Sequence, residues 1–178
     1  PPVGDEHIIY LRSNTPLPSK TQWPWDSPDR PTNSYLRYAA SAVDLVGRNV
    51  KSPCSFEVTI ESDIPVNAGV SSSAAVTLAT TAAAAAFFGL SPSVADLCEM
   101  AYMVEHDILK TGAGRMDPYA CGMGGLLHLN CGTKPVSVEQ YDFPDTLGIV
   151  LADTLTPHET KLFISSKRLR FQQGDRDI

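Results

Sequence analysis

One stretch of the chain, VNAGVSSSAAVTLATTAAAAAFFGL at positions 66–90, constrains the fold more than any other. A glycine and three serines lead into a long run of alanine, threonine and valine. Alanine favours helix, and its small side chain lets a helix pack closely against a sheet. Because Ser and Thr interrupt the run, and Gly69 and Gly89 bound it, we predict a buried helix here and not a membrane span.

The entry to this helix has the features of an anion-binding site. A helix N-terminus leaves backbone N–H groups unpaired and carries partial positive charge. Gly69 lets the backbone approach a ligand closely, and the following serines can cap the helix, donate to phosphate oxygens or bind Mg²⁺. The loop is neither a Walker A loop nor a dinucleotide fingerprint, because Gly-Lys-Ser/Thr and GxGxxG are both missing. In the alternative interpretation, Ser71 only caps the helix and Ser72 and Ser73 are polar surface residues.

Two acids follow in the next part of the chain. We predict Glu105 near the end of a helix over 91–109 and Asp117 just past a glycine-rich turn. Gly112 and Gly114 can fold the chain back, so that both carboxylates face one cavity. One carboxylate would hold a metal ion while the other addresses a hydroxyl, and phosphoryl transfer requires both functions. The alternative is a pair of unrelated surface acids.

The rest of the pattern predicts an α+β fold, because strands and helices mix without a strict βαβ alternation. Alternation and helical periodicity predict strands at 5–14, 54–65, 126–130 and 147–153, and helices at 34–49, 91–109 and 157–173. Residues 15–34 are interpreted as a loop, and 110–125 as glycine-rich and irregular. We expect Trp23 and Trp25 to pin the loop to the core, in preference to stacking on a sugar or base.

Charge and cysteine content argue against several other classes of protein. The net charge is -6 and no long basic stretch precedes residue 161, which disfavours a nucleic-acid surface. The late basic residues are interpreted as a solvated helix face: Lys161, Lys167, Arg168 and Arg170. None of the four cysteines forms a CxxC pair, so we expect no zinc site and a reducing, cytoplasmic compartment. Cys98 is expected to be a small buried hydrophobe, and the N-terminal residues lack the pattern of a signal peptide.

The two motifs together resemble those of the GHMP small-molecule kinases, the group of galactokinase, homoserine kinase, mevalonate kinase and phosphomevalonate kinase. PVNAGVSSSAA at 65–75 is similar to their phosphate-binding motif Pro-x-x-x-Gly-Leu-x-Ser-Ser-Ala, with Val70 in place of Leu. EHDILKTGAGRMDPY at 105–119 resembles, more narrowly, the galactokinase segment Glu-His-x-x-x-x-Thr-x-x-Gly-x-Met-Asp-Gln. GGLLHLNC and LADTLTPHETKL, which contains His158, resemble later galactokinase segments. The resemblance covers residues from about 34 to 173.

This resemblance implies a fold, an activity and a set of site residues. The fold would be a ribosomal-protein-S5-domain-2-like N-terminal domain over 1–145, followed by the start of a ferredoxin-like C-terminal domain over 146–178. The activity would be ATP-dependent phosphorylation of a sugar hydroxyl. Ser73 and Glu105 would hold Mg²⁺. Asp117 would act on the hydroxyl as general base or electrostatic partner, with Gly114 and Tyr119 also at the acceptor. The residues implied to bind the ATP phosphates are Pro65, Asn67, Ala68, Gly69, Val70, Ser71, Ser72, Ser73 and Ala74.

The sequence also departs from the family pattern. Pro118 replaces Gln and Arg115 replaces a small or apolar residue, both beside the expected sugar site. The motif Gly-Arg-x-Asn-Leu-Ile-Gly-Glu-His and the third, glycine-rich family motif lie outside these residues, so we expect a part of a longer kinase that is incomplete by itself. Three alternatives stay open: a GHMP kinase for another sugar or small alcohol, a non-catalytic ligand sensor, and an RNA-binding domain of similar topology. The intact segment 69–75 favours an enzyme over a sensor, and the acidic charge disfavours RNA binding. The oligomeric state is not predicted.

Overall fold

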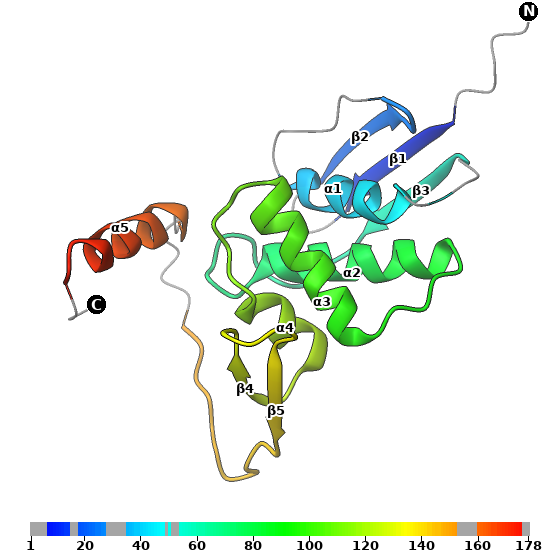
Figure 1. Cartoon of the computed structure of the whole chain (residues 1–178). Coiled ribbons are helices and arrows are strands. Elements are labelled where there is room, and N and C mark those ends of the chain that lie inside the picture. Colours follow the sequence, from blue (N-terminus) through cyan, green and yellow to red (C-terminus); the bar gives the residue numbers. More distant parts are fainter. Residues whose placement is uncertain are drawn as a thin grey trace, which may run out of the picture.

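The structure, a computed structural model, describes residues 7–14, 18–27, 35–48, 50, 54–152 and 160–175. Within them a three-stranded sheet is covered by helices, and a separate two-stranded sheet follows (Figure 1). The α+β class predicted from the sequence is confirmed. No helix in the described part of the chain is both long and apolar enough to cross a bilayer.

The three-stranded sheet has the order β2-β1-β3. Its strands are β1 (Ile8–Ser13), β2 (Ser19–Pro24) and β3 (Phe56–Ile60). β2 runs antiparallel to β1, whereas β3 runs parallel to it, so the chain must cross over between β2 and β3. The helix α1 (Leu36–Gly47) makes this crossover. Alternation along the strands sends apolar side chains to the helical face and polar ones to solvent.

The core lies between this sheet and the first two helices. Ile9 and Leu11 of β1 pack against one face of α1 and against Val76 of α2 (Ser72–Phe87). The buried face of α2 consists of small residues: Ala74, Val76, Thr77, Thr80, Thr81, Ala84 and Ala85. The buried threonine hydroxyls cost little because they bond backbone carbonyls one turn earlier, Thr77 to Ser73 and Thr81 to Thr77, each at 2.7 Å. The small-sided buried helix predicted from the sequence is confirmed.

Aromatic residues close one end of this core. Trp23 is 4% exposed, and Trp25 packs edge-on against Phe56 and Phe88. Gly47 ends α1 directly beneath the Trp25 ring, where an added Cβ would lie 2.8 Å from Cη2. The two tryptophans therefore anchor their segment to the core, as the sequence predicted.

The second half of the described chain begins with α3 (Val94–Met103), whose first turn is closed by a capping box between Ser93 and Asp96. This helix continues as the π-helix η1 (Val104–Ile108). α4 (Met116–Met123), β4 (Leu126–Asn130) and β5 (Ser137–Tyr141) follow, the two strands pairing antiparallel. Figure 1 shows α5 (Thr160–Gln172) standing away from these elements.

Several predicted elements differ from the structure. The segment interpreted as a loop contains β2, because pairing with β1 orders a polar sequence that has little strand signal of its own. The segment interpreted as irregular contains α4, in which Pro118 falls in the first turn, where its missing N–H has no helical partner to lose. The strand predicted at 147–153 is wrong over 147–152, where no strand forms and the apolar side chains are exposed. His158 and Asn49 lie outside the described residues.

Candidate functional site

In the loop before α2, every second residue has a positive, left-handed φ. Asn67, Gly69 and Ser71 have φ of 61°, 76° and 60°, whereas Ala68 and Val70 between them stay out of the left-handed region. Such alternation turns successive N–H groups toward one concave side, which forms an anion-binding nest. A Cβ built on Gly69 meets no atom within 4 Å, so the loop borders open space at this point.

The start of α2 adds further donors to this loop. Ser71 is the N-cap residue, yet its side chain makes no capping hydrogen bond. The first amide to bond back into the helix is that of Ala75, to the carbonyl of Ser71 at 3.0 Å. The amides of residues 72–74 therefore lie at the open end of the helix, together with its partial positive charge. The alternative in which Ser71 is merely a capping residue is not supported by this geometry.

Ser73 and Glu105 are joined directly. The Ser73 hydroxyl donates to Oε2 of Glu105 at 3.0 Å. Glu105 is only 3% exposed, and its other oxygen, Oε1, is buried without a hydrogen-bond partner. Burial raises the pKa of Glu105 to about 7; the Ser73 hydrogen bond opposes this and the nearby charge of Asp117 adds to it. A buried carboxyl with one oxygen unsatisfied is a suitable place for a cation.

These donors fit Mg²⁺ that arrives with phosphates. Magnesium is bound through one or two carboxylates, water and substrate oxygens, and it does not need a cage made by protein alone. Oε1 of Glu105 is free of protein partners, and the Ser73 hydroxyl lies beside Oε2. No group of three or more His, Cys, Asp or Glu side chains converges among the described residues. The donor set thus suits a metal whose remaining ligands are not protein side chains.

The π-helix fixes the backbone of Glu105. Its carbonyl accepts from both the amide and the hydroxyl of Thr111, each at 3.0 Å. Lys110 and Gly112 then take φ of 52° and 81°, which reverses the chain toward α4. Single π turns inside helices are frequent at functional sites. Here the π-helix holds the buried Glu105 directly after the end of α3.

Asp117 is the second residue of α4 and is half-buried. Its charge contributes to the raised pKa of Glu105 and to that of Cys121 one helical turn later, so these groups lie near one another. Asp117 and Glu105 are thus near enough for their charges to interact, and Ser73 contacts Glu105 directly, whereas the shared cavity that the sequence predicts stays a prediction. The roles assigned to these side chains stay predictions.

The other predicted site residues are placed less uniformly. Gly114 is exposed in the turn before α4. Tyr119 is 2% exposed, its hydroxyl donates to Oε1 of Glu99 at 3.0 Å, and burial raises its pKa to about 12. Its predicted place at the acceptor stays a prediction, and the structure shows an anchoring contact. The methyl group of Ala74 faces the core, so only its backbone is available to a ligand, whereas Pro65 at the start of the motif is exposed.

Sequence reasoning missed two residues near these acids. Cys121 follows Asp117 by four positions, a spacing that is informative only once 116–123 is known to be a helix. Glu99 accepts hydrogen bonds from Arg115 and Tyr119, which lie 16 and 20 positions later. No local period pairs residues so far apart, because the turn between the helices sets the contact.

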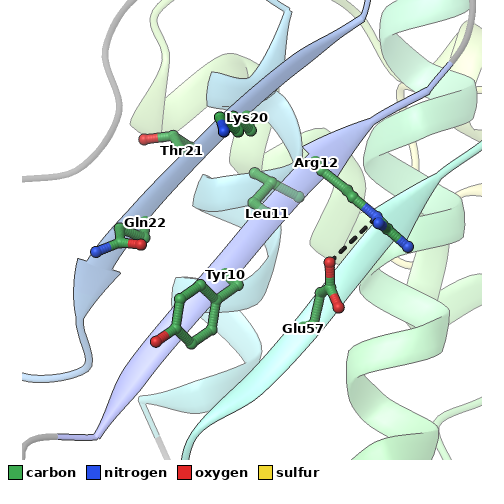
Figure 2. Close-up of a pocket in the computed structure, with 7 residues that line it drawn as sticks. All are labelled: Tyr10, Leu11, Arg12, Lys20, Thr21, Gln22 and Glu57. Atoms are coloured by element: carbon green, nitrogen blue, oxygen red, sulfur yellow. Dashed lines mark ion pairs between the residues drawn. The ribbon is translucent and has the colours of Figure 1, made fainter.

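A separate hollow lies on the outer face of the sheet (Figure 2). It has a volume of about 430 Å³ and is lined by side chains that include Tyr10, Lys20 and Gln22. At its edge Nε of Arg12 pairs with Glu57 at 3.1 Å. None of its lining residues belongs to the loop at 67–71 before α2 (the serine loop), to η1 or to α4. The hollow is therefore distinct from the group formed by Ser73, Glu105 and Asp117.

Comparison with known proteins finds a family match over the part of the chain that contains the candidate site. Residues 37–125 match the family model described as GHMP kinases N terminal domain. The chain belongs to the GHMP kinase family. The match covers nearly all of α1, the loop at 67–71, α2 and both acids, Glu105 and Asp117.

Relatives of this GHMP kinase chain include two kinds of enzyme. It is 31% identical over 140 residues to a mevalonate kinase of Pyrococcus horikoshii, which covers 79% of this chain and 39% of that protein. It is 30% identical over 129 residues to a galactokinase of Bacillus subtilis, covering 71% and 32%. The family rests on the match to the family model, and these relatives do not decide the galactokinase branch that the sequence indicates.

A solved structure shares the fold of this GHMP kinase chain. The mevalonate kinase of Methanococcus jannaschii superposes with a TM-score of 0.67 over 78% of this chain and 43% of that one, at 22% identity. The chain spans about 40% of the length of the mevalonate kinase relatives it matches. The expected fold, the N-terminal domain of a GHMP kinase, is confirmed.

Proposed function

We propose that this chain carries the phosphate-binding and catalytic part of an ATP-dependent kinase that phosphorylates a small-molecule alcohol, with a sugar as the first candidate acceptor. The observation that carries the proposal is the Ser73–Glu105 hydrogen bond beneath the serine loop, with Asp117 beside it. This arrangement supplies what phosphoryl transfer requires, namely bound phosphates, neutralised charge and an oriented nucleophile.

The loop and the start of α2 would bind the ATP phosphates. The left-handed residues Asn67, Gly69 and Ser71 curve the backbone, and the amides of 72–74 point out of the helix end. Amide donors and the helix dipole stabilise negative charge without a lysine. Ser71 and Ser72 are half-buried at this helix end, and their hydroxyls would donate to phosphate oxygens.

Ser73 and Glu105 would hold Mg²⁺ with the nucleotide. The unpartnered Oε1 of Glu105 and the Ser73 hydroxyl are the donors available to it. The ion would supply charge neutralisation between the β- and γ-phosphoryl groups. Burial keeps the Glu105 carboxyl out of competition with bulk water, which strengthens its electrostatic effect on any bound cation.

Asp117 would act on the acceptor hydroxyl. Its carboxylate accepts a hydrogen bond from that hydroxyl and orients the oxygen toward the γ-phosphorus. The new oxygen–phosphorus bond forms as the bond to the β-phosphate oxygen breaks, and ADP leaves. The proton of the hydroxyl passes to Asp117 as general base, or it stays on the attacking oxygen, hydrogen-bonded to Asp117, and passes to the transferred phosphoryl group as the new bond forms.

A sugar is proposed first because residues 105–119 follow the galactokinase pattern in register. The second candidate acceptor is a hydroxy acid such as mevalonate, which is favoured by the 31% identity to mevalonate kinases over most of the chain. We propose further that residues 1–145 form the N-terminal domain and 146–178 begin a second one, since α5 stands away from the other elements (Figure 1).

The test is an acceptor panel with the full-length protein. ADP release would be measured with ATP and Mg²⁺ against galactose, other hexoses and mevalonate, and kcat/KM compared between acceptors. Turnover with a hexose supports the sugar kinase, and turnover with mevalonate alone supports the second candidate. Nucleotide binding without turnover of any alcohol would indicate a ligand sensor and contradict the proposed activity.

A further inference from the structure

Arg115, the residue before α4, is held by α3 through its side chain. Its Nε donates to both oxygens of Glu99, at 2.8 Å and 3.1 Å. The arginine side chain is only 24% exposed. One N–H is shared between the two carboxylate oxygens, and the pair is charge-assisted and partly buried. This ion pair ties the side chain of Arg115 to α3.

A second contact reinforces the first. The guanidinium lies 3.9 Å from the centroid of the Tyr102 ring, and the other partner of that ring is His106, stacked at 4.9 Å. Nδ1 of His106 lies 2.9 Å from the carbonyl of Ala113, within hydrogen-bonding distance. Together with the bonds from Thr111 to the carbonyl of Glu105, these contacts attach the turn before α4 to the α3–η1 helix.

These contacts bracket Asp117. Arg115 and Tyr119 stand two residues before and two residues after it, and both bind the same carboxylate, Glu99. Glu99 lies on α3, whose continuation η1 carries Glu105. The single turn of helix that bears Asp117 is therefore fastened to the element that bears the other acid.

We infer that Arg115 and Glu99 are positioning residues, which hold the first turn of α4 so that Asp117 stays in register with Glu105 and the phosphates. The inference rests on the proposed function and adds to it a residue pair that touches neither nucleotide nor acceptor. A displacement of about 1 Å at a reacting group lowers turnover by about 100-fold, whereas it leaves binding by other residues nearly unchanged.

The test compares Arg115→Met, Arg115→Lys and the matched control Arg12→Met in the full-length protein. Arg12 is also paired through Nε with a carboxylate, but on the sheet. We expect Arg115→Met to lower kcat by about 10- to 100-fold, with KM for the acceptor and Kd for ATP changed by less than about threefold. Arg115→Lys keeps the charge and is expected to recover part of kcat, and Arg12→Met is expected to leave kcat unchanged.

Hydrogen exchange at the amide of Tyr119, which donates to the carbonyl of Arg115 at 3.2 Å, gives a readout that does not depend on turnover, and Arg115→Met should speed exchange there. If Arg115→Met does not fold, Glu99→Gln, which keeps an acceptor oxygen, is expected to lower kcat in the same selective way. An unchanged kcat in the folded variant overturns the inference, as does a rise in acceptor KM alone, which would make Arg115 a binding residue. If the wild-type protein phosphorylates no alcohol, the proposed function is refuted and the positioning role with it. If the wild type turns over normally and the variant is unaffected, only the positioning role is refuted.

Discussion

The hydroxyl of Ser73 and the carboxylate of Glu105 meet at 3.0 Å, although 32 positions separate them in the chain. This contact joins the first turn of α2 to the π-helix η1. The second oxygen of Glu105 has no hydrogen-bond partner, although it is buried. One hydrogen bond therefore orients a carboxyl whose other side is available to a cation.

Weakening this pair should raise the magnesium requirement. For Ser73→Ala and Glu105→Gln we expect the Mg²⁺ concentration that gives half-maximal turnover to rise by about tenfold or more, since each variant removes one oxygen ligand of the proposed metal site. The measurement is a Mg²⁺ titration of turnover at fixed ATP. Glu139→Gln removes an exposed carboxylate on β5 and serves as the control. Unchanged magnesium dependence in both site variants would remove these residues from the metal site.

Glu105 should make the stability of the ligand-free protein depend on pH. Below its usual pKa of 4.5 the carboxyl is protonated in both folded and unfolded states, so it imposes no penalty. Between 4.5 and about 7 the unfolded chain loses this proton while the folded protein keeps it, so stability falls as pH rises. Above pH 7 or so the carboxyl is ionised in both states, and the loss in the free energy of unfolding levels off at about 3 kcal/mol.

Urea unfolding of the wild type and of Glu105→Gln from pH 4 to 8 would isolate this contribution. Gln keeps an oxygen that accepts from Ser73 but does not titrate. The difference in the free energy of unfolding should shift in favour of Glu105→Gln as pH rises through the interval. A difference that is flat with pH would show that the folded protein does not hold this carboxyl protonated.

Asp117→Asn should separate chemistry from nucleotide binding. The amide cannot take a proton and carries no charge, so we expect kcat to fall by about 100- to 10,000-fold. Kd for ATP should change by less than about threefold, because the phosphate loop is untouched. Steady-state kinetics and calorimetric titration with ATP provide the two numbers. Asp107→Asn, an exposed acid on η1, is the control, and near-normal turnover of Asp117→Asn would retire the proposed role.

Gly122→Ala should destabilise the packing of α4. A Cβ at this position would lie 2.6 Å from Sγ of Cys98 and 3.2 Å from Cδ2 of Leu78, on α3 and α2 respectively. Overpacking of this kind costs about 1–3 kcal/mol, which thermal or urea unfolding can detect. At Gly148 an added Cβ meets no atom within 4 Å, so Gly148→Ala should stay within about 0.5 kcal/mol of wild type. Equal stability of the two variants would contradict the close approach of the three helices.

The sequence predicted the parts of the site that depend on local rules. The small-sided helix, the loop at its N-terminus and the strand of β3 follow from composition and periodicity, and each is present. The pairing of Ser73 with Glu105 was expected from the family resemblance, not from spacing. What the sequence did not provide depends on contacts between distant segments: β2 forms because β1 pairs with it, and the first turn of α4 is held by Glu99. The π-helix had no signal of its own, because 104–108 continues the periodicity of an ordinary helix.

The most direct test of the phosphate site is a titration of the ¹⁵N-labelled full-length protein with Mg²⁺ and a non-hydrolysable ATP analogue, followed by amide chemical shifts. The largest changes are predicted at residues 67–74, where the nest and the start of α2 present their N–H groups, with smaller changes near Glu105. Shifts concentrated instead on the outer sheet face around Tyr10 and Lys20, with residues 67–74 unmoved, would contradict the account and place the nucleotide elsewhere.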